Sequence, residues 1–135
     1  MMPKKLIIYT DGGARNNPGP GGIGVVIKDG QKNIIAEISE YIGTATNNQA
    51  EYKAVIAAIK KAQDLEAEEL DFYLDSELVV KQLKREYRVK DKGLAPLFVK
   101  VYNAMLGFKK TTFTHVRREF NQEADRLVNE AIDGR

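Results

Sequence analysis

The amino-acid sequence contains no cysteine. This absence excludes disulfide bonds, zinc–thiolate sites and thiol nucleophiles, and it suits a chain kept in a reducing compartment, so we expect a cytoplasmic protein. Long apolar runs are missing as well. The run that begins at Leu6 is interrupted at Asp11, which is too short for a signal-peptide core or a membrane span. We therefore expect no association with a membrane.

An excess of charge of one sign is also absent. The formal net charge of +2 is too small to indicate a nucleic-acid-binding protein by bulk charge. Such a role must depend on where the charges lie. The length of 135 residues and the hydrophobic fraction of 43% fit one globular domain, residues 1–135, with a single core.

Turn residues and apolar periodicity predict the order β-β-β-α-β-α-α-β-α. Three strands with short links, including a tight hairpin at Asp29-Gly30, predict an antiparallel meander. A right-handed crossover then places the fourth strand parallel to the first and beside it. The expected strands are 6–9, 24–28, 32–42, 70–75 and 111–116, and the expected helices are 46–63, 76–83, 94–106 and 121–132.

The starts of the expected helices carry capping signals. Thr46 is followed three positions later by Gln49, which makes a capping box. Ser76 and Asn121 stand where side-chain caps of the second and last helices are expected. Pro96 falls in the first turn of the third helix, where proline is tolerated. These signals support the predicted helix boundaries.

Four acidic residues are candidates for one site. Asp11 and Asp75 each follow an apolar strand, and the parallel arrangement brings them to the same edge of the sheet, on strands about 5 Å apart. Glu51 shares a helix face with apolar side chains, and Asp125 borders the apolar stripe of the last helix. Burying such carboxylates is costly unless they have partners, so we expect all four to meet in one pocket.

Four carboxylates at one edge repel one another unless something positive lies between them. The sequence offers no buried lysine or arginine that is obviously placed to do this. Oxygen ligands without histidine or cysteine favour a hard divalent ion, Mg²⁺ or Mn²⁺. Because two such ions close together are a standard arrangement for the attack of water on a phosphodiester, the acidic set indicates a metal-dependent nuclease.

Four motifs, spread over nearly the whole chain, resemble those of the type 1 ribonuclease H family. Any one of them alone would be a weak signal, but together they are highly specific. The resemblance implies an α/β, ribonuclease H-like fold with a five-stranded mixed sheet, three antiparallel strands then two parallel, flanked by helices. The motifs are Thr10-Asp11-Gly12-Gly13 with Asn17-Pro18-Gly19-Pro20-Gly21-Gly22, Thr46-Asn47-Asn48-Gln49-Ala50-Glu51, Asp75-Ser76 and Asn121-Gln122-Glu123-Ala124-Asp125.

The resemblance implies an endoribonuclease that hydrolyses the RNA strand of RNA–DNA hybrids with two Mg²⁺ ions, Mn²⁺ being the alternative, and leaves 5′-phosphate and 3′-hydroxyl ends. It implies a monomer whose partner is the hybrid, with double-stranded RNA as a further candidate substrate. Short polar side chains and exposed backbone suit contact with the 2′-OH across a wide minor groove. The implied metal ligands are Asp11, Glu51, Asp75 and Asp125, and the implied substrate-binding residues are Gly12, Gly13, Asn17, Thr46 (near a DNA-strand phosphate), Asn48, Gln49 and Arg118.

Two features depart from the family pattern. Many members carry a histidine that assists proton transfer or product release in the loop between the last strand and the last helix. In this chain the loop is Arg117-Arg118-Glu119-Phe120. The single histidine, His115, lies within the predicted strand, and we expect Arg118 to fill part of the role by contacting the phosphate. The long basic protrusion after the second helix is also missing, although the segment 81–92 contains six basic residues.

Parts of the sequence also fit three other interpretations. The segment 19–24 matches G-x-G-x-x-G, but a β-rich run follows it where a dinucleotide-binding fingerprint needs a helix, so this interpretation is rejected. A proofreading exonuclease resembles a pattern with an acidic residue two positions after Asp11, where Gly13 stands. The remaining alternative is a hybrid-binding module with weak or no catalysis, which the presence of all four carboxylates disfavours.

Overall fold

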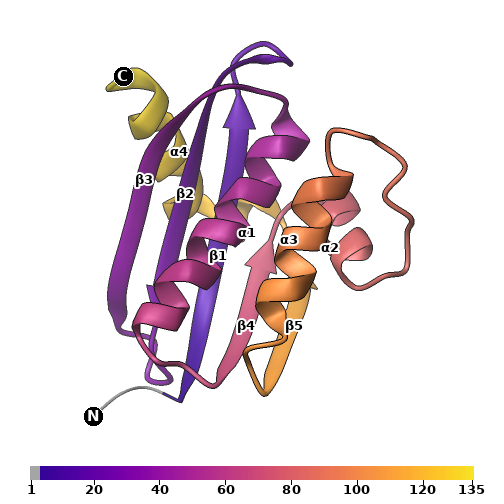
Figure 1. Ribbon diagram of the computed structural model, residues 1–135. Helices are drawn as coiled ribbons and strands as arrows, with labels where there is room; N and C mark the ends of the chain where they lie inside the picture. The colour runs from indigo at the N-terminus through magenta and orange to yellow at the C-terminus, as the bar shows by residue number, and fades with distance from the viewer. Residues whose placement is uncertain (1–3) are drawn as a thin grey trace.

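The centre of the fold is β1 (Lys5–Ala14), which pairs antiparallel with β2 (Gly19–Lys28) and parallel with β4 (Glu69–Leu74). β3 (Ile34–Ala45) pairs antiparallel with β2, and β5 (Lys110–His115) pairs parallel with β4. The strand order β3-β2-β1-β4-β5 confirms the predicted mixed sheet, including the fourth strand beside the first (Figure 1).

The computed structural model describes residues 4–135. The first three residues of the predicted domain 1–135 therefore lie outside the described part of the chain. Within residues 4–135, no helix combines the length and the hydrophobicity that crossing a membrane requires.

Helices cover both faces of the sheet (Figure 1). α1 (Asn47–Asp64) and α3 (Ala95–Met105) lie on one face, and α4 (Gln122–Asp133) lies on the other. The short helix α2 (Glu77–Leu83) directly follows β4 and packs against β5, and a 3-10 turn, η1 (Arg118–Phe120), precedes α4. The helices therefore enclose the sheet as the α/β pattern predicts.

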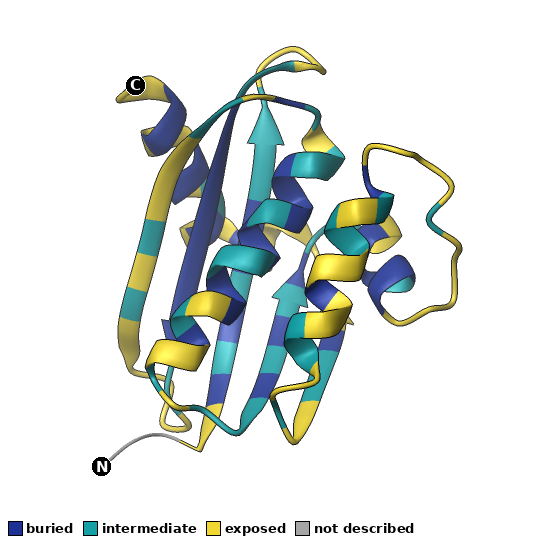
Figure 2. Ribbon diagram, in the orientation of Figure 1, coloured by how far each residue is buried: buried dark blue, intermediate teal, exposed yellow. Residues whose placement is uncertain are grey.

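The core forms where the apolar periodicities of strands and helices face one another. In α1, Ala54, Val55, Ala58 and Ile59 recur at helical spacing and are fully buried against the sheet. Figure 2 shows the buried residues following the inner faces of the helices. A polar contact ties α1 to α2 within this core, because the Tyr52 hydroxyl donates to Gln82 Oε1 at 2.7 Å.

Most of the predicted helix starts are confirmed. The Thr46 hydroxyl accepts from the Gln49 backbone N–H at 3.1 Å, and Gln49 Oε1 accepts from the Thr46 N–H at 2.9 Å, which completes the capping box. Ser76 Oγ accepts from the Val79 N–H at 3.3 Å, and Pro96 lies in the first turn of α3. Asn121 is the N-cap residue of α4, as predicted, but its side chain makes no capping bond.

Several strand boundaries also differ from the sequence prediction, and β3 ends at Ala45 instead of at residue 42. β1 continues through Asp11 to Ala14 and β2 begins at Gly19, because the glycines adopt extended backbone and pair across the hairpin. The sequence predicts strands only at 6–9 and 24–28, because glycine usually favours turns. The link after β2 is wider than a tight hairpin, since the Asp29 N–H donates to the Asn33 carbonyl at 2.9 Å and β3 begins only at Ile34.

Candidate active site

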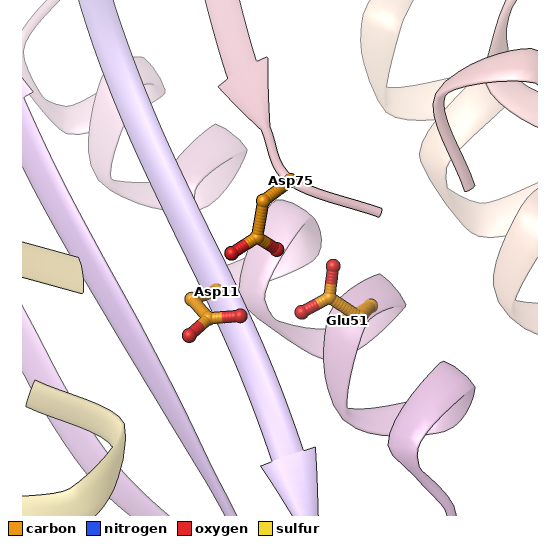
Figure 3. Close-up of side chains that lie close together, drawn as sticks. All are labelled: Asp11, Glu51 and Asp75. Carbon is orange, nitrogen blue, oxygen red and sulfur yellow. The ribbon is translucent and has the colours of Figure 1, made fainter. Parts of the chain in front are cut away.

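Three of the predicted carboxylates converge at one edge of the sheet. Asp11 lies on β1, Glu51 in the second turn of α1 and Asp75 directly after β4. One oxygen from each lies within 4.8 Å of the others, and no other such acidic group occurs among residues 4–135. Figure 3 shows the three side chains pointing toward one another from three separate elements.

The register of the sheet explains this convergence. The parallel pairing of β1 and β4 ends at Thr10 and Leu74, so Asp11 and Asp75 are the next residues on neighbouring strands. α1 crosses close above β1 at this point, because Gly12 has no side chain. A Cβ there would overlap the backbone of Ala50 in α1. The absence of a side chain at Gly12 therefore allows α1 to approach β1 closely, so that Glu51 lies beside Asp11.

The Gly12 N–H connects two of the carboxylates. It lies 3.0 Å from Asp11 Oδ1, and it also donates to Glu51 Oε1. A backbone N–H shared by two acidic side chains favours their charged forms and fixes their orientation. It supplies only one donor, however, so most of the carboxylate oxygens at this edge need another partner.

Burial and mutual repulsion oppose ionisation at this site. Burial is the main cause that raises the pKa of Asp11, from 3.8 to about 7, and the charges of Asp75 and Asp125 add to it. Burial and the nearby Asp11 charge raise the pKa of Glu51 well above its ordinary value. Burial also raises the pKa of Asp75, although the positive charge of Arg118 acts in the opposite direction. The site is therefore short of positive charge.

The donor set fits a hard divalent cation. Asp11 is 8% exposed and Glu51 is 5% exposed, and Glu51 Oε2 is buried without a hydrogen-bond partner in the protein. Three carboxylates with a free buried oxygen and no nitrogen or sulfur ligand match the preference of Mg²⁺ or Mn²⁺ for oxygen. A cation at this edge would also remove the repulsion that raises the pKa values.

Asp125 lies at the rim of the same site. It is half-buried in the first turn of α4, and its charge contributes to the raised pKa of Asp11. It is not part of the tight group formed by the other three carboxylates. The structure thus brings all four predicted residues to one cleft, three of them in close contact.

The cleft has a volume of about 420 Å³ and contains only some of the predicted substrate-binding residues. Gly12, Gly13, Asn48 and Arg118 line it, and its walls also include residues that were not among the predicted metal ligands and substrate-binding residues. Asn47 is the most notable of these, because its Oδ1 accepts from the Ala14 N–H at 2.8 Å; its position within the second motif was the available signal. The other unpredicted lining residues are Ala14, Arg15, Ser76, Val128, Asn129 and Ile132.

The other three predicted substrate-binding residues do not line this cleft. Asn17 Oδ1 accepts from the Asn47 N–H at 2.9 Å at the start of α1. Thr46 and Gln49 use their side chains in the capping box of the same helix. These contacts place all three beside the cleft, at the first turn of α1, where they hold the helix that carries Glu51.

In the absence of a divalent ion, we expect the buried Asp11 to make the fold less stable as the pH rises from about 5 to about 8. The Asp11 carboxyl loses its proton near its ordinary pKa of 3.8 in the unfolded chain, but only near a pKa of about 7 in the folded protein. Stability therefore falls as the pH rises between these two values, and the loss is complete above the folded-state pKa. The expected loss is on the order of a few kcal/mol.

Urea unfolding in the presence of a chelator at these two pH values measures the effect. The unfolding free energy of the wild type minus that of Asp11→Asn isolates this carboxyl from the others. This difference should be larger at the lower pH, where the wild type is the more stable relative to the variant. A difference that is the same at both pH values would contradict the expectation.

Comparisons with known proteins find similar sequences over nearly the whole chain. Residues 9–131 match a family described as reverse transcriptase-like. The chain is 43% identical over 125 residues to ribonuclease HI of Halobacterium salinarum, covering 93% of this chain and 63% of that protein. It is 40% identical over 130 residues to a bifunctional protein of Mycobacterium tuberculosis, covering 96% of this chain and 36% of that protein. The chain thus spans less than two thirds of the length of these relatives.

Solved structures share the fold closely. The crystal structure of RNase H1 from Halobacterium salinarum has a TM-score of 0.94 and 41% identity, with 97% of this chain and 99% of that chain covered. LC11-RNase H1, isolated from compost and solved in complex with an RNA/DNA hybrid, has a TM-score of 0.92 and 46% identity, with 96% and 97% covered. Both similarities extend over nearly the full length of the aligned chains.

Proposed function

This chain belongs to the ribonuclease H family, and we propose that it hydrolyses the RNA strand of RNA–DNA hybrids and leaves 5′-phosphate and 3′-hydroxyl ends. The observation that carries the proposal is the convergence of Asp11, Glu51 and Asp75 in an open cleft. The binding of an RNA/DNA hybrid by LC11-RNase H1, at 46% identity, supports the choice of substrate.

We propose that Asp11, Glu51, Asp75 and Asp125 hold two Mg²⁺ ions, with Mn²⁺ as the alternative. Such ions supply an activated water and a stabilised leaving oxygen when they are bound. The carboxylates themselves supply the negative charge that keeps the ions at the sheet edge, and Glu51 offers a buried oxygen that has no other partner.

The remaining residues of the cleft would place the substrate. Arg118 lines the cleft and lies close enough to Asp75 to oppose the rise in its pKa, so its charge can attract a backbone phosphate to the acidic edge. Gly13 and Asn48 line the same cleft and present backbone and amide groups that suit 2′-OH contacts. Asn17, Thr46 and Gln49 would then extend the substrate surface along the start of α1.

We further propose that the protein acts as a cytoplasmic monomer and that residues 1–135 form one catalytic domain. Double-stranded RNA is a second substrate to compare with the hybrid. The absence of a histidine from the loop 117–120 leaves product release to other groups, and Arg118 is the candidate at that position.

The test is incubation with an end-labelled RNA–DNA hybrid in Mg²⁺, in Mn²⁺ and in chelator. We expect internal cuts in the RNA strand that require the divalent ion and leave 5′-phosphate ends. Tight binding of an uncut hybrid under all three conditions would favour the alternative, a binding module without catalysis. Cleavage that persists in excess chelator would contradict the metal-dependent mechanism.

A further inference from the structure

Asn121 is a buried amide at the junction of η1 and α4. It is 1% exposed, although it stands at the N-cap position of α4, where side chains usually remain near the surface. The side-chain oxygen of a capping asparagine accepts a hydrogen bond from a backbone N–H of its own helix, but the side chain of Asn121 makes no such bond. Because burial of an amide is costly without compensation, its contacts elsewhere require an explanation.

The side chain of Asn121 reaches β1 at the acidic site. Its Nδ2 donates to the Thr10 carbonyl at 2.9 Å, immediately before Asp11 on β1. The backbone carbonyl of Asn121 accepts from the Asp125 N–H at 3.1 Å, as the N-cap residue of a helix does. Asn121 therefore joins the start of α4, the helix that carries Asp125, to the strand residue that precedes Asp11.

We propose that Asn121 is a positioning residue that fixes Asp11 on β1 relative to α4, so that the carboxylates are in place before a cation binds. This inference rests on the proposed metal-dependent function. Outer groups that orient ligating carboxylates typically change metal affinity or activity by about 10- to 100-fold when they are removed. A purely structural amide would instead change stability and leave the folded enzyme active.

The test replaces Asn121 by leucine, which keeps the branching of the side chain and removes both polar groups of the amide. Mg²⁺ binding is measured by isothermal titration calorimetry, and kcat and KM are measured on the hybrid at saturating Mg²⁺. We expect the dissociation constant for Mg²⁺ to rise about tenfold or more and kcat to fall about 10- to 100-fold. The KM for the hybrid should change by no more than about threefold, since Asn121 does not line the cleft.

The matched control is Gln82→Leu, which removes another buried amide, the acceptor of the Tyr52 hydroxyl, away from the cleft. Both variants are expected to lose stability, but Gln82→Leu should keep Mg²⁺ binding and kcat within about twofold of the wild type. Equal losses of Mg²⁺ affinity in the two variants, or wild-type Mg²⁺ affinity in Asn121→Leu, would overturn the inference.

If Asn121→Leu fails to fold, Asn121→Ser is measured in its place, and the same comparison decides. Calorimetry keeps this inference separate from the proposed function. Wild-type protein that binds Mg²⁺ but leaves the hybrid uncut would contradict the nuclease, whereas the positioning role would still be decided by the Mg²⁺ affinities of the variants.

Discussion

Asp11→Asn is expected to reduce hybrid cleavage by roughly a thousandfold or more, while the fold and hybrid binding are retained. Asp11 is central to the acidic group: it shares the Gly12 N–H with Glu51, and its charge acts on Glu51. The amide has almost the same shape, so the sheet and the cleft are preserved. It removes one negative charge from the position where the divalent cation is expected, so the loss should appear in kcat.

Single-turnover cleavage at saturating hybrid measures this loss, and gel-shift binding in Ca²⁺ reports hybrid affinity separately. The control is Asp64→Asn, which neutralises an exposed carboxylate near the end of α1, outside the cleft. It should cleave within about twofold of the wild type, as surface substitutions usually have small effects. If Asp11→Asn cleaved at the wild-type rate, Asp11 would not be a metal ligand.

Gly12→Ala is expected to lower the free energy of unfolding by about 3 kcal/mol and to abolish most of the activity. The added Cβ would overlap the Ala50 carbonyl, which belongs to a helix backbone and cannot rotate away. β1 and α1 must then separate. The separation weakens the core beneath α1 and moves Glu51 away from Asp11, so stability and catalysis fall together.

Urea denaturation and hybrid cleavage measure both effects. Gly30→Ala is the matched control, because a Cβ at Gly30 meets nothing within 4 Å. It should leave stability within about 0.5 kcal/mol and activity unchanged. Similar unfolding free energies for the two alanine variants would show that α1 does not depend on close approach at Gly12.

The role of Gly12 could not be predicted from the sequence alone. The pattern of strands, the parallel crossover and the capping box were predictable, because each depends on local periodicity or on a short-range turn rule. The sequence predicts strands at 6–9 and 24–28 and therefore leaves Gly12 and its neighbours between strands, as turn residues. In the structure they are extended strand, and the close neighbour at Gly12 is α1. Which backbone comes close depends on tertiary packing, which a local pattern does not contain.

The site itself was predicted in outline. Asp11 and Asp75 were placed together by topology alone, and the parallel register confirms that placement. The rim position of Asp125 was not predictable, because it depends on how α4 is set against the sheet. Asn121 was interpreted as a cap, since an asparagine before a helix usually is one. Its actual contact, with the Thr10 carbonyl, joins segments far apart in sequence and leaves no local signal.

The central position of β1 links ion binding to the folding pathway. The antiparallel partner β2 follows β1 almost at once, but the parallel partner β4 is reached only after β3 and α1. Closing the β1–β4 pair therefore carries a larger loop-closure entropy cost than closing the β1–β2 hairpin, and we expect this pair to form later. Closure also forces Asp11 against Asp75, so electrostatic repulsion opposes this step. A bound divalent ion would replace this repulsion by attraction to both carboxylates and would thus stabilise the β1–β4 pair.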